Sequence, residues 1–123
     1  MDKKMQKLIE KLEQINFNTL DIDELLDNRD LDVFDTEWNR VYREVEELKN
    51  AENYTKEEIE QNKKIRRQVF LLIHELTDYT ELAEYISDDF GLIFDAARLG
   101  YKDLWLDKLV SCYEKGIIPS GDL

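Results

Sequence analysis

The sequence predicts an all-α protein, folded as a single-domain bundle of about five to six helices. Apolar residues recur at steps of three and four along most of the chain, which is the spacing of amphipathic helices. Only four Gly and one Pro occur in 123 residues, so turn signals are few. The chain has the length of one domain, and its 42% hydrophobic content is sufficient for a core. We therefore expect one helical domain over residues 1–119 and a flexible tail over residues 120–123.

The N-terminal part predicts one long helix followed by a short one. The long helix is expected near residues 2–16, with Asp2 in position to cap it. Its stripe contains five apolar side chains, namely Met5, Leu8, Ile9, Leu12 and Ile15. Residues 20–26 can form two further turns, capped by Thr19 or Asp21. Because so short a helix is unstable alone, it depends on tertiary packing.

The middle of the chain predicts two long helices. The first is expected between about residues 32 and 50 on a stripe of Phe34, Trp38, Val41, Val45 and Leu48. Thr55 and Glu58 then fit a capping box, in which each side chain satisfies an unpaired backbone N–H, so a helix over 56–78 should follow. One face of that helix carries Ile65, Val69, Leu72 and Leu76. Since residues 69–73 are apolar nearly all round, we expect it to be the central helix of the bundle.

The C-terminal part predicts two more helices. Thr80 is expected to cap a helix that ends at Gly100, a typical C-terminal glycine, and Ser87 is a candidate interruption. The last helix should run from about 102 to 115, with Gly116 just beyond it. Its apolar side carries Trp105, Leu109, Cys112 and Tyr113.

Negative charge is concentrated in one segment. The chain carries a formal net charge of −12, and residues 21–37 contribute eight acids against the single base Arg29. A general affinity for nucleic acid or for anionic lipid is excluded, since both require positive potential. Two interpretations stay open for the segment: an ordinary solvated surface, or a patch that meets a basic partner. A partner would also find an aromatic anchor close by in Trp38 or Tyr42.

The sequence contains no motif that indicates a metal site or an enzyme active site. Calcium loops starting at Asp21 or Asp30 fail, because apolar residues occupy required oxygen-ligand positions and no Gly stands at position six. His74 is the only histidine, which excludes His-rich zinc sites, and a local pair with Asp78 is expected. Cys112 lies near a helix C-terminus, where a thiol gains no activation, so it should be a packing residue. We expect no enzyme activity, no metal and no cofactor.

The sequence also predicts a cytoplasmic protein. A single cysteine allows no internal disulfide, and the charged N-terminus is followed by no uninterrupted apolar segment. Neither a secretory signal nor a membrane span is therefore expected. A monomer is favoured, and no membrane or nucleic acid partner is expected.

The C-terminal third resembles the small helical immunity proteins encoded beside bacterial polymorphic toxins, including contact-dependent inhibition systems. The resemblance covers about 40 residues, and it rests on Ile86, Ser87, Asp88, Asp89, Phe90, Gly91, Leu92, Ile93, Ala96, Gly100, Tyr101, Trp105, Leu106, Leu109, Tyr113, Gly116, Ile118 and Pro119. It implies a non-enzymatic inhibitor that binds one toxin domain inside the producing cell. The Tyr-Tyr-Pro signature of the colicin-nuclease immunity proteins is absent, so no interface residues are transferred from that group.

These observations together predict an acidic surface that binds and neutralises a toxin domain, most simply a nuclease, whose substrate groove must be basic to hold phosphates. The expected partner-binding residues are Asp21, Asp23, Glu24, Asp27, Asp30, Asp32, Asp35, Glu37, Trp38 and Tyr42. The alternative is an acidic helical adaptor or regulatory protein that binds a basic protein segment and has no toxin.

Overall fold

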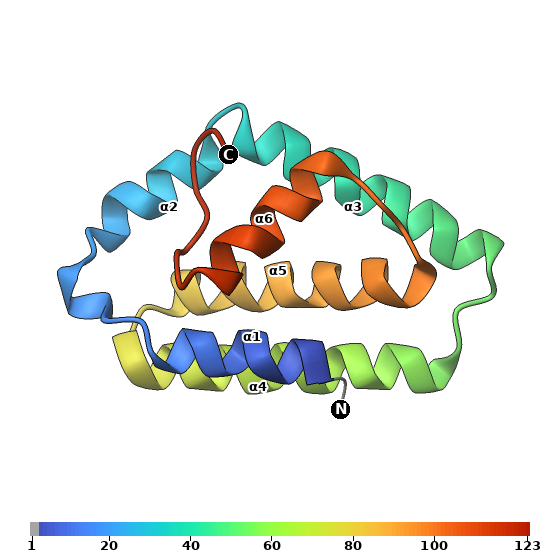
Figure 1. Ribbon diagram of the computed structural model, residues 1–123, viewed down its shortest axis with the longest axis horizontal. Helices are drawn as coiled ribbons and strands as arrows, with labels where there is room; N and C mark the ends of the chain where they lie inside the picture. The colour runs from blue at the N-terminus through green and yellow to red at the C-terminus, as the bar shows by residue number, and fades with distance from the viewer. Residues whose placement is uncertain (1–2) are drawn as a thin grey trace. The chain divides into compact units, whose positions relative to one another are not determined.

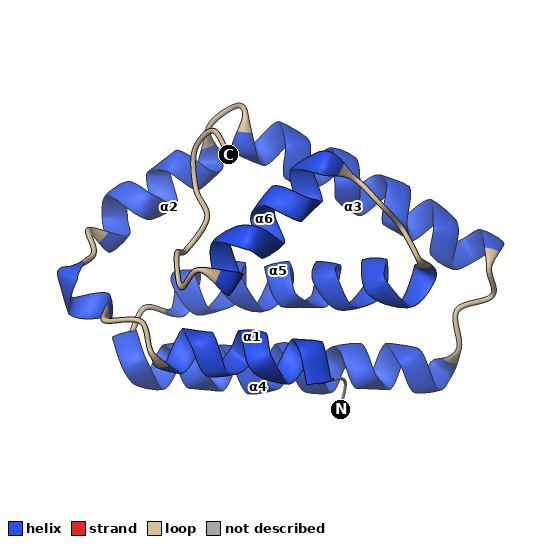
Figure 2. Cartoon of the chain, in the orientation of Figure 1, coloured by secondary structure: helices blue, strands red, loops and turns tan. Residues whose placement is uncertain are grey.

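The computed structural model describes residues 3–123, and within that range it contains six α-helices, one short 3-10 helix and no strand (Figures 1 and 2). The elements are α1 (Lys3–Glu13), η1 (Phe17–Thr19), α2 (Ile22–Asp30), α3 (Phe34–Ala51), α4 (Lys56–Thr77), α5 (Thr80–Leu99) and α6 (Leu104–Glu114). The predicted all-α class is confirmed. The predicted cap at Asp2 lies outside the described residues.

The chain forms two compact units. The first takes in the chain up to Val41 and again from Asp103 to Leu123, and the second is Tyr42–Lys102. In the first unit α1 packs against α6, and in the second unit α4 and α5 pack along each other (Figure 1). The single domain over 1–119 and the flexible tail over 120–123 stay predictions.

The first unit confirms the N-terminal stripe but shortens its helix. Met5, Leu8, Ile9 and Leu12 are all buried, whereas Ile15 lies beyond the helix and is half-buried. α1 ends at Glu13, three residues before the predicted end, because the Asn16 side chain accepts a hydrogen bond from the Asn18 N–H at 3.2 Å and begins η1 instead. Asp21 caps α2 by accepting from the Glu24 N–H at 3.1 Å, and α2 then extends to Asp30, further than predicted.

α4 begins as predicted but does not have the predicted role. The capping box of Thr55 and Glu58 is formed in both directions. The buried face consists of Asn62, Ile65, Val69 and Ile73. Leu71 and Leu76 are exposed, so the predictions of an inward face through Leu76 and of a central helix are wrong. A stretch that is apolar nearly all round offers several stripes, and only the neighbouring helix decides which one is buried.

α5 is the most buried helix of the described chain. Twelve of its 20 residues are buried, and it continues through Ser87 without a break. The predicted interruption is wrong because the Ser87 hydroxyl donates to the Glu84 carbonyl at 2.9 Å, which satisfies it inside the helix. The predicted cap at Thr80 is also wrong, since Thr80 is the first helical residue and Tyr79 takes the cap position. The predicted C-terminal glycine is confirmed: Gly100 has φ +68°, a left-handed conformation that suits glycine.

α6 lies within one or two residues of its predicted bounds. Asp103 caps it, and Trp105, Leu109 and Tyr113 are buried as expected. Cys112 is half-buried, and burial raises the pKa of its thiol, so the reactive thiolate is disfavoured at neutral pH. This agrees with a packing role.

Candidate interaction surface

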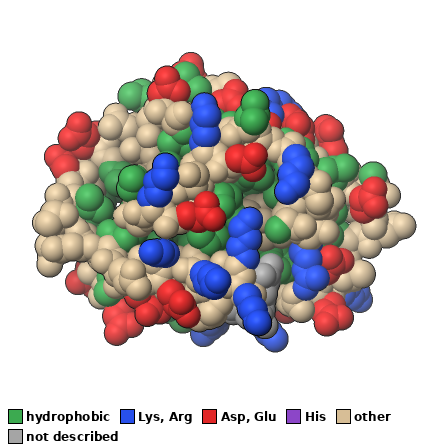
Figure 3. Space-filling model, in the orientation of Figure 1, with side chains coloured by type: hydrophobic (Ala, Val, Ile, Leu, Met, Phe, Trp, Pro, Cys, Tyr) green, Lys and Arg blue, Asp and Glu red, His purple; other side chains and the backbone are tan. Residues whose placement is uncertain are grey.

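α2 presents its carboxylates on one face and buries another. Asp23, Asp27 and Asp30 recur at steps of four and three, so they lie on one exposed face of the helix, with Glu24 at its edge. The buried side carries Ile22, Leu26 and Arg29. We call Asp23, Glu24, Asp27 and Asp30 the acidic face. On the side of the molecule drawn in Figure 3, acidic and basic side chains are interspersed.

The one base of the acidic segment is turned into the protein. Arg29 is 5% exposed, and its guanidinium lies 4.4 Å from the centre of the Phe34 ring. It also donates a hydrogen bond to the Pro119 carbonyl at 3.2 Å. Phe34 in turn meets Trp105 edge-on, with ring centres 5.2 Å apart. Arg29 therefore supports the interior of the first unit and does not lie among the exposed carboxylates.

The turn between α2 and α3 carries two exposed apolar side chains. Leu31 is 59% exposed and Val33 is 46% exposed. The turn is internally bonded, since the Asp35 N–H donates to the Leu31 carbonyl at 3.1 Å and the Thr36 hydroxyl donates to the Asp32 carboxylate. Asp32 and Asp35 are themselves exposed. We call Leu31 and Val33 the apolar tip. In the chain, acidic residues stand on both sides of it.

Glu37 takes part in an ion-pair network within the first unit. The guanidinium of Arg40 lies 2.6 Å from the Glu37 carboxylate and 3.0 Å from that of Asp103. Burial favours the neutral form of Asp103, but the hydrogen bonds from Arg40 and from the Leu106 N–H outweigh it and lower the pKa of Asp103. Glu37 is half-buried, so it differs from the exposed acids that precede it.

The ten residues singled out from the sequence fall into separate groups. Asp21 caps α2, the acidic face lies along α2, and Asp32 and Asp35 lie in and just after the turn. Trp38 is half-buried, and Tyr42 is exposed and belongs to the second unit. Sequence reasoning missed Leu31 and Val33. Helical spacing carried a signal, because Leu31 follows Asp27 by four residues and so continues the acidic face.

A buried carboxylate organises the second unit. Asp95 on α5 is 4% exposed, and the Lys49 ammonium lies 2.5 Å from one of its oxygens. The Tyr54 hydroxyl donates to the other oxygen at 2.6 Å. Lys49 also pairs with Glu46 at 2.9 Å. The network therefore attaches the end of α3 and the following loop to α5, which none of the sequence patterns indicated.

This network makes stability sensitive to alkaline pH. Burial, followed by the hydrogen bond to Asp95, raises the pKa of Tyr54 above its usual value of 10.0. Burial disfavours the charged form of Lys49, but the hydrogen bonds to Asp95 and Glu46 outweigh it, so the pKa of Lys49 is also raised. A group that binds its proton more tightly when folded stabilises the protein below its unfolded pKa, and that stabilisation is lost as the pH rises.

We expect the free energy of unfolding to fall as the pH rises above about 10, and to fall less steeply in the Tyr54→Phe variant, which has no phenolic proton. Urea denaturation at pH 9 and pH 11 measures both slopes. Equal slopes for the two proteins would contradict the assignment to Tyr54.

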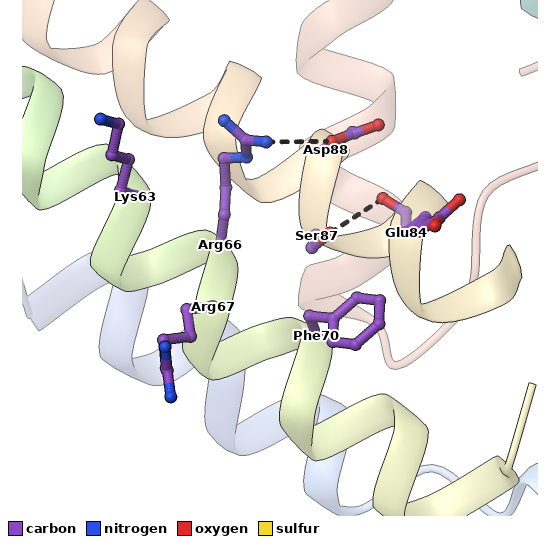
Figure 4. A pocket seen from close by; sticks show the side chains of 7 residues that line it. All are labelled: Lys63, Arg66, Arg67, Phe70, Glu84, Ser87 and Asp88. Atoms are coloured by element: carbon purple, nitrogen blue, oxygen red, sulfur yellow. Dashed lines mark hydrogen bonds and ion pairs between the residues drawn. The ribbon is translucent and has the colours of Figure 1, made fainter. Parts of the chain in front are cut away.

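A groove in the second unit lies between α4 and α5 (Figure 4). It has a volume of about 530 Å³ and is lined by Lys63, Arg66, Arg67, Phe70, Glu84, Ser87 and Asp88. Arg66 reaches Asp88 at 3.8 Å, and Arg67 points away from that pair (Figure 4). Three cations on α4 stand beside two carboxylates on α5, so the side chains that line the groove keep one net positive charge.

The single histidine lies next to this groove. His74 stacks on Phe70, with ring centres 6.0 Å apart, and the predicted side-chain pair with Asp78 is not formed. The backbone explains the difference, since Asp78 takes a left-handed conformation that ends α4 and donates its N–H to the His74 carbonyl.

Further findings bear on function. Among residues 3–123 no helix has the length and hydropathy needed to cross a bilayer, and no group of three or more His, Cys, Asp or Glu side chains is placed to hold a metal ion. The family model described as Immunity protein PIM1 matches residues 2–120. No curated protein and no solved structure matches the chain.

Proposed function

The chain belongs to the Immunity protein PIM1 family, and from this premise we propose that it binds and neutralises a cognate bacterial toxin domain through the acidic face of α2. It acts as a non-enzymatic inhibitor in the cytoplasm of the cell that makes the toxin. The single observation that carries the choice of surface is the alignment of Asp23, Asp27 and Asp30 on one exposed side of α2.

A nuclease is the kind of toxin that this surface suits. The substrate groove of a nuclease is basic, because it must hold phosphates. Carboxylates gathered on one helix face create a local negative potential, which attracts such a groove over a distance of about one Debye length, roughly 8–10 Å in physiological salt. Attraction of this kind accelerates encounter and selects the partner, and it contributes less to the lifetime of the complex. Rapid capture matters here, since the free toxin damages its own cell.

The acids need an apolar contact to hold the complex together. The sequence points to Trp38 or Tyr42, and both lie on α3, with Tyr42 46% exposed. Aromatic side chains provide a large contact area at low entropic cost, which is typical of interface anchors.

Growth rescue tests the immunity function itself. We expect the toxin gene to lie directly upstream of the gene for this chain, and the protein encoded there is expressed alone and together with the chain in a sensitive host. We expect growth arrest with the toxin domain alone and growth with both proteins. Continued arrest with both proteins would reject the proposed function, and rescue without a physical complex would favour the adaptor or regulatory alternative.

Neutralising the acidic face should slow association. In the variant Asp23→Asn, Glu24→Gln, Asp27→Asn and Asp30→Asn we expect the association rate constant to drop by roughly 10- to 100-fold at low salt, with a weaker dependence on ionic strength. Surface plasmon resonance against the inactivated toxin domain measures both effects.

A matched control removes four exposed acids from the second unit, namely Glu52, Glu57, Glu75 and Glu81. The net charge changes by the same amount in both variants. If the control slows association as much as the acidic-face variant does, net charge and not this face governs binding.

A further inference from the structure

We propose that Leu31 and Val33 form the apolar anchor of the toxin interface and enter an apolar pocket within the toxin's basic surface. This inference rests on the proposed function. The inference goes beyond the proposed function because it names the contact that holds the complex together. That contact is an aliphatic pair in the turn between α2 and α3, in place of the aromatic anchor.

The first argument is exposure. Single apolar residues on a surface are ordinary, but here two large ones occur within three residues and are 59% and 46% exposed. Covering them with a partner would remove this apolar surface from water, which favours binding. Trp38 is already half-buried, so it has less area left to offer a partner, and Tyr42, although 46% exposed, belongs to the second unit and not to the unit of the acidic face.

The second argument is the rigidity of the turn. On one side Arg29 is held under α2 by the Phe34 ring and by its hydrogen bond to the Pro119 carbonyl. On the other side Phe34 is buried against Trp105. Two buried anchors thus bracket Leu31 and Val33, so little conformational freedom remains to be lost on binding.

The third argument is the charge around the tip, which defines the partner. Asp30, Asp32 and Asp35 are exposed and border Leu31 and Val33 in the chain. Interfaces place apolar residues at the centre and polar ones at the rim, and hot spots lie in such desolvated centres. The complementary surface is therefore a basic rim around a pocket that accepts two aliphatic side chains. The exposed Leu104 differs, since only Asp107 among its neighbours in the chain is an exposed acid and Asp103 is paired with Arg40, and beside Ile117 the exposed Glu114 is followed by the base Lys115.

The test compares a variant of the tip with a matched control. The double variant Leu31→Gln and Val33→Thr removes the apolar surface and retains every carboxylate. Leu104→Gln makes the same chemical change at a side chain that is 81% exposed in the same unit. The probe is the inactivated toxin domain from the growth-rescue experiment, immobilised for surface plasmon resonance at two salt concentrations. Thermal unfolding followed by circular dichroism checks that both variants fold.

For the tip variant we expect the dissociation rate constant to rise by roughly 10- to 100-fold while the association rate constant changes less than about twofold, since hot-spot contacts mainly set the lifetime of a complex. The Leu104→Gln variant should bind as the unchanged protein does. If the unchanged protein binds and the tip variant dissociates no faster, the inference is overturned and the proposed function stands. The inference is also overturned if Leu104→Gln accelerates dissociation equally. If the unchanged protein does not bind the toxin domain, the proposed function fails, and the inference fails with it.

Discussion

Replacing Asp95 with alanine is expected to lower the free energy of unfolding by about 3 kcal/mol, because it leaves the Lys49 ammonium and the Tyr54 hydroxyl without their shared acceptor. Removing one partner of a buried ion pair costs about 3–5 kcal/mol in proteins. The lower end applies here, since Lys49 keeps Glu46 as a second partner. The loss is large against a typical total stability of about 5–15 kcal/mol. Urea denaturation at neutral pH measures it.

Two weaker variants test the cause of that loss. Tyr54→Phe removes one hydrogen bond and should cost about 1 kcal/mol, and Glu46→Gln removes only the more exposed partner of Lys49 and should cost less than about 1 kcal/mol. If Glu46→Gln destabilised the protein as much as Asp95→Ala, the buried position of Asp95 would not be the cause.

Replacing Phe34 with alanine should be at least as damaging, with a loss of about 3–5 kcal/mol, as for other large aromatic residues in cores. Phe34 is 2% exposed, and it contacts both the Arg29 guanidinium and the Trp105 ring. The substitution opens a cavity beneath the turn and leaves Arg29 without the ring that covers it. Circular dichroism during urea denaturation measures the loss.

A gentler substitution connects this packing to function. Phe34→Leu should keep the protein folded but loosen the turn, so that the toxin domain dissociates faster. Ile9 is 1% exposed in the same unit, and Ile9→Val serves as a control that destabilises the fold without touching the turn. If both variants change dissociation equally, stability and not the geometry of the turn is responsible.

The sequence by itself determined several helix ends through local rules, although the local prediction of a cap at Thr80 is wrong. The capping box of Thr55 and Glu58 and the terminal Gly100 depend only on neighbouring residues, and both are confirmed. Of the two caps that the sequence left open before α2, Thr19 and Asp21, the structure uses Asp21. The charge excess over residues 21–37 is likewise a property of the chain alone. The C-terminal resemblance predicted an immunity protein, and the family match agrees.

Only the tertiary structure decided which apolar stripe of each helix is covered by a neighbouring helix. Local patterns could not choose among the apolar stripes of α4, and they assigned the central role to it although α5 is the more buried helix. Local patterns also could not show that Arg29 is buried against the Phe34 ring, or that Asp95 binds both Lys49 and Tyr54. Nor could they show that Leu31 and Val33 are exposed. Helix signals act within about one turn, whereas the bond from Arg29 to Pro119 spans 90 residues and the bond from Tyr54 to Asp95 spans 41, so only the folded arrangement fixes them.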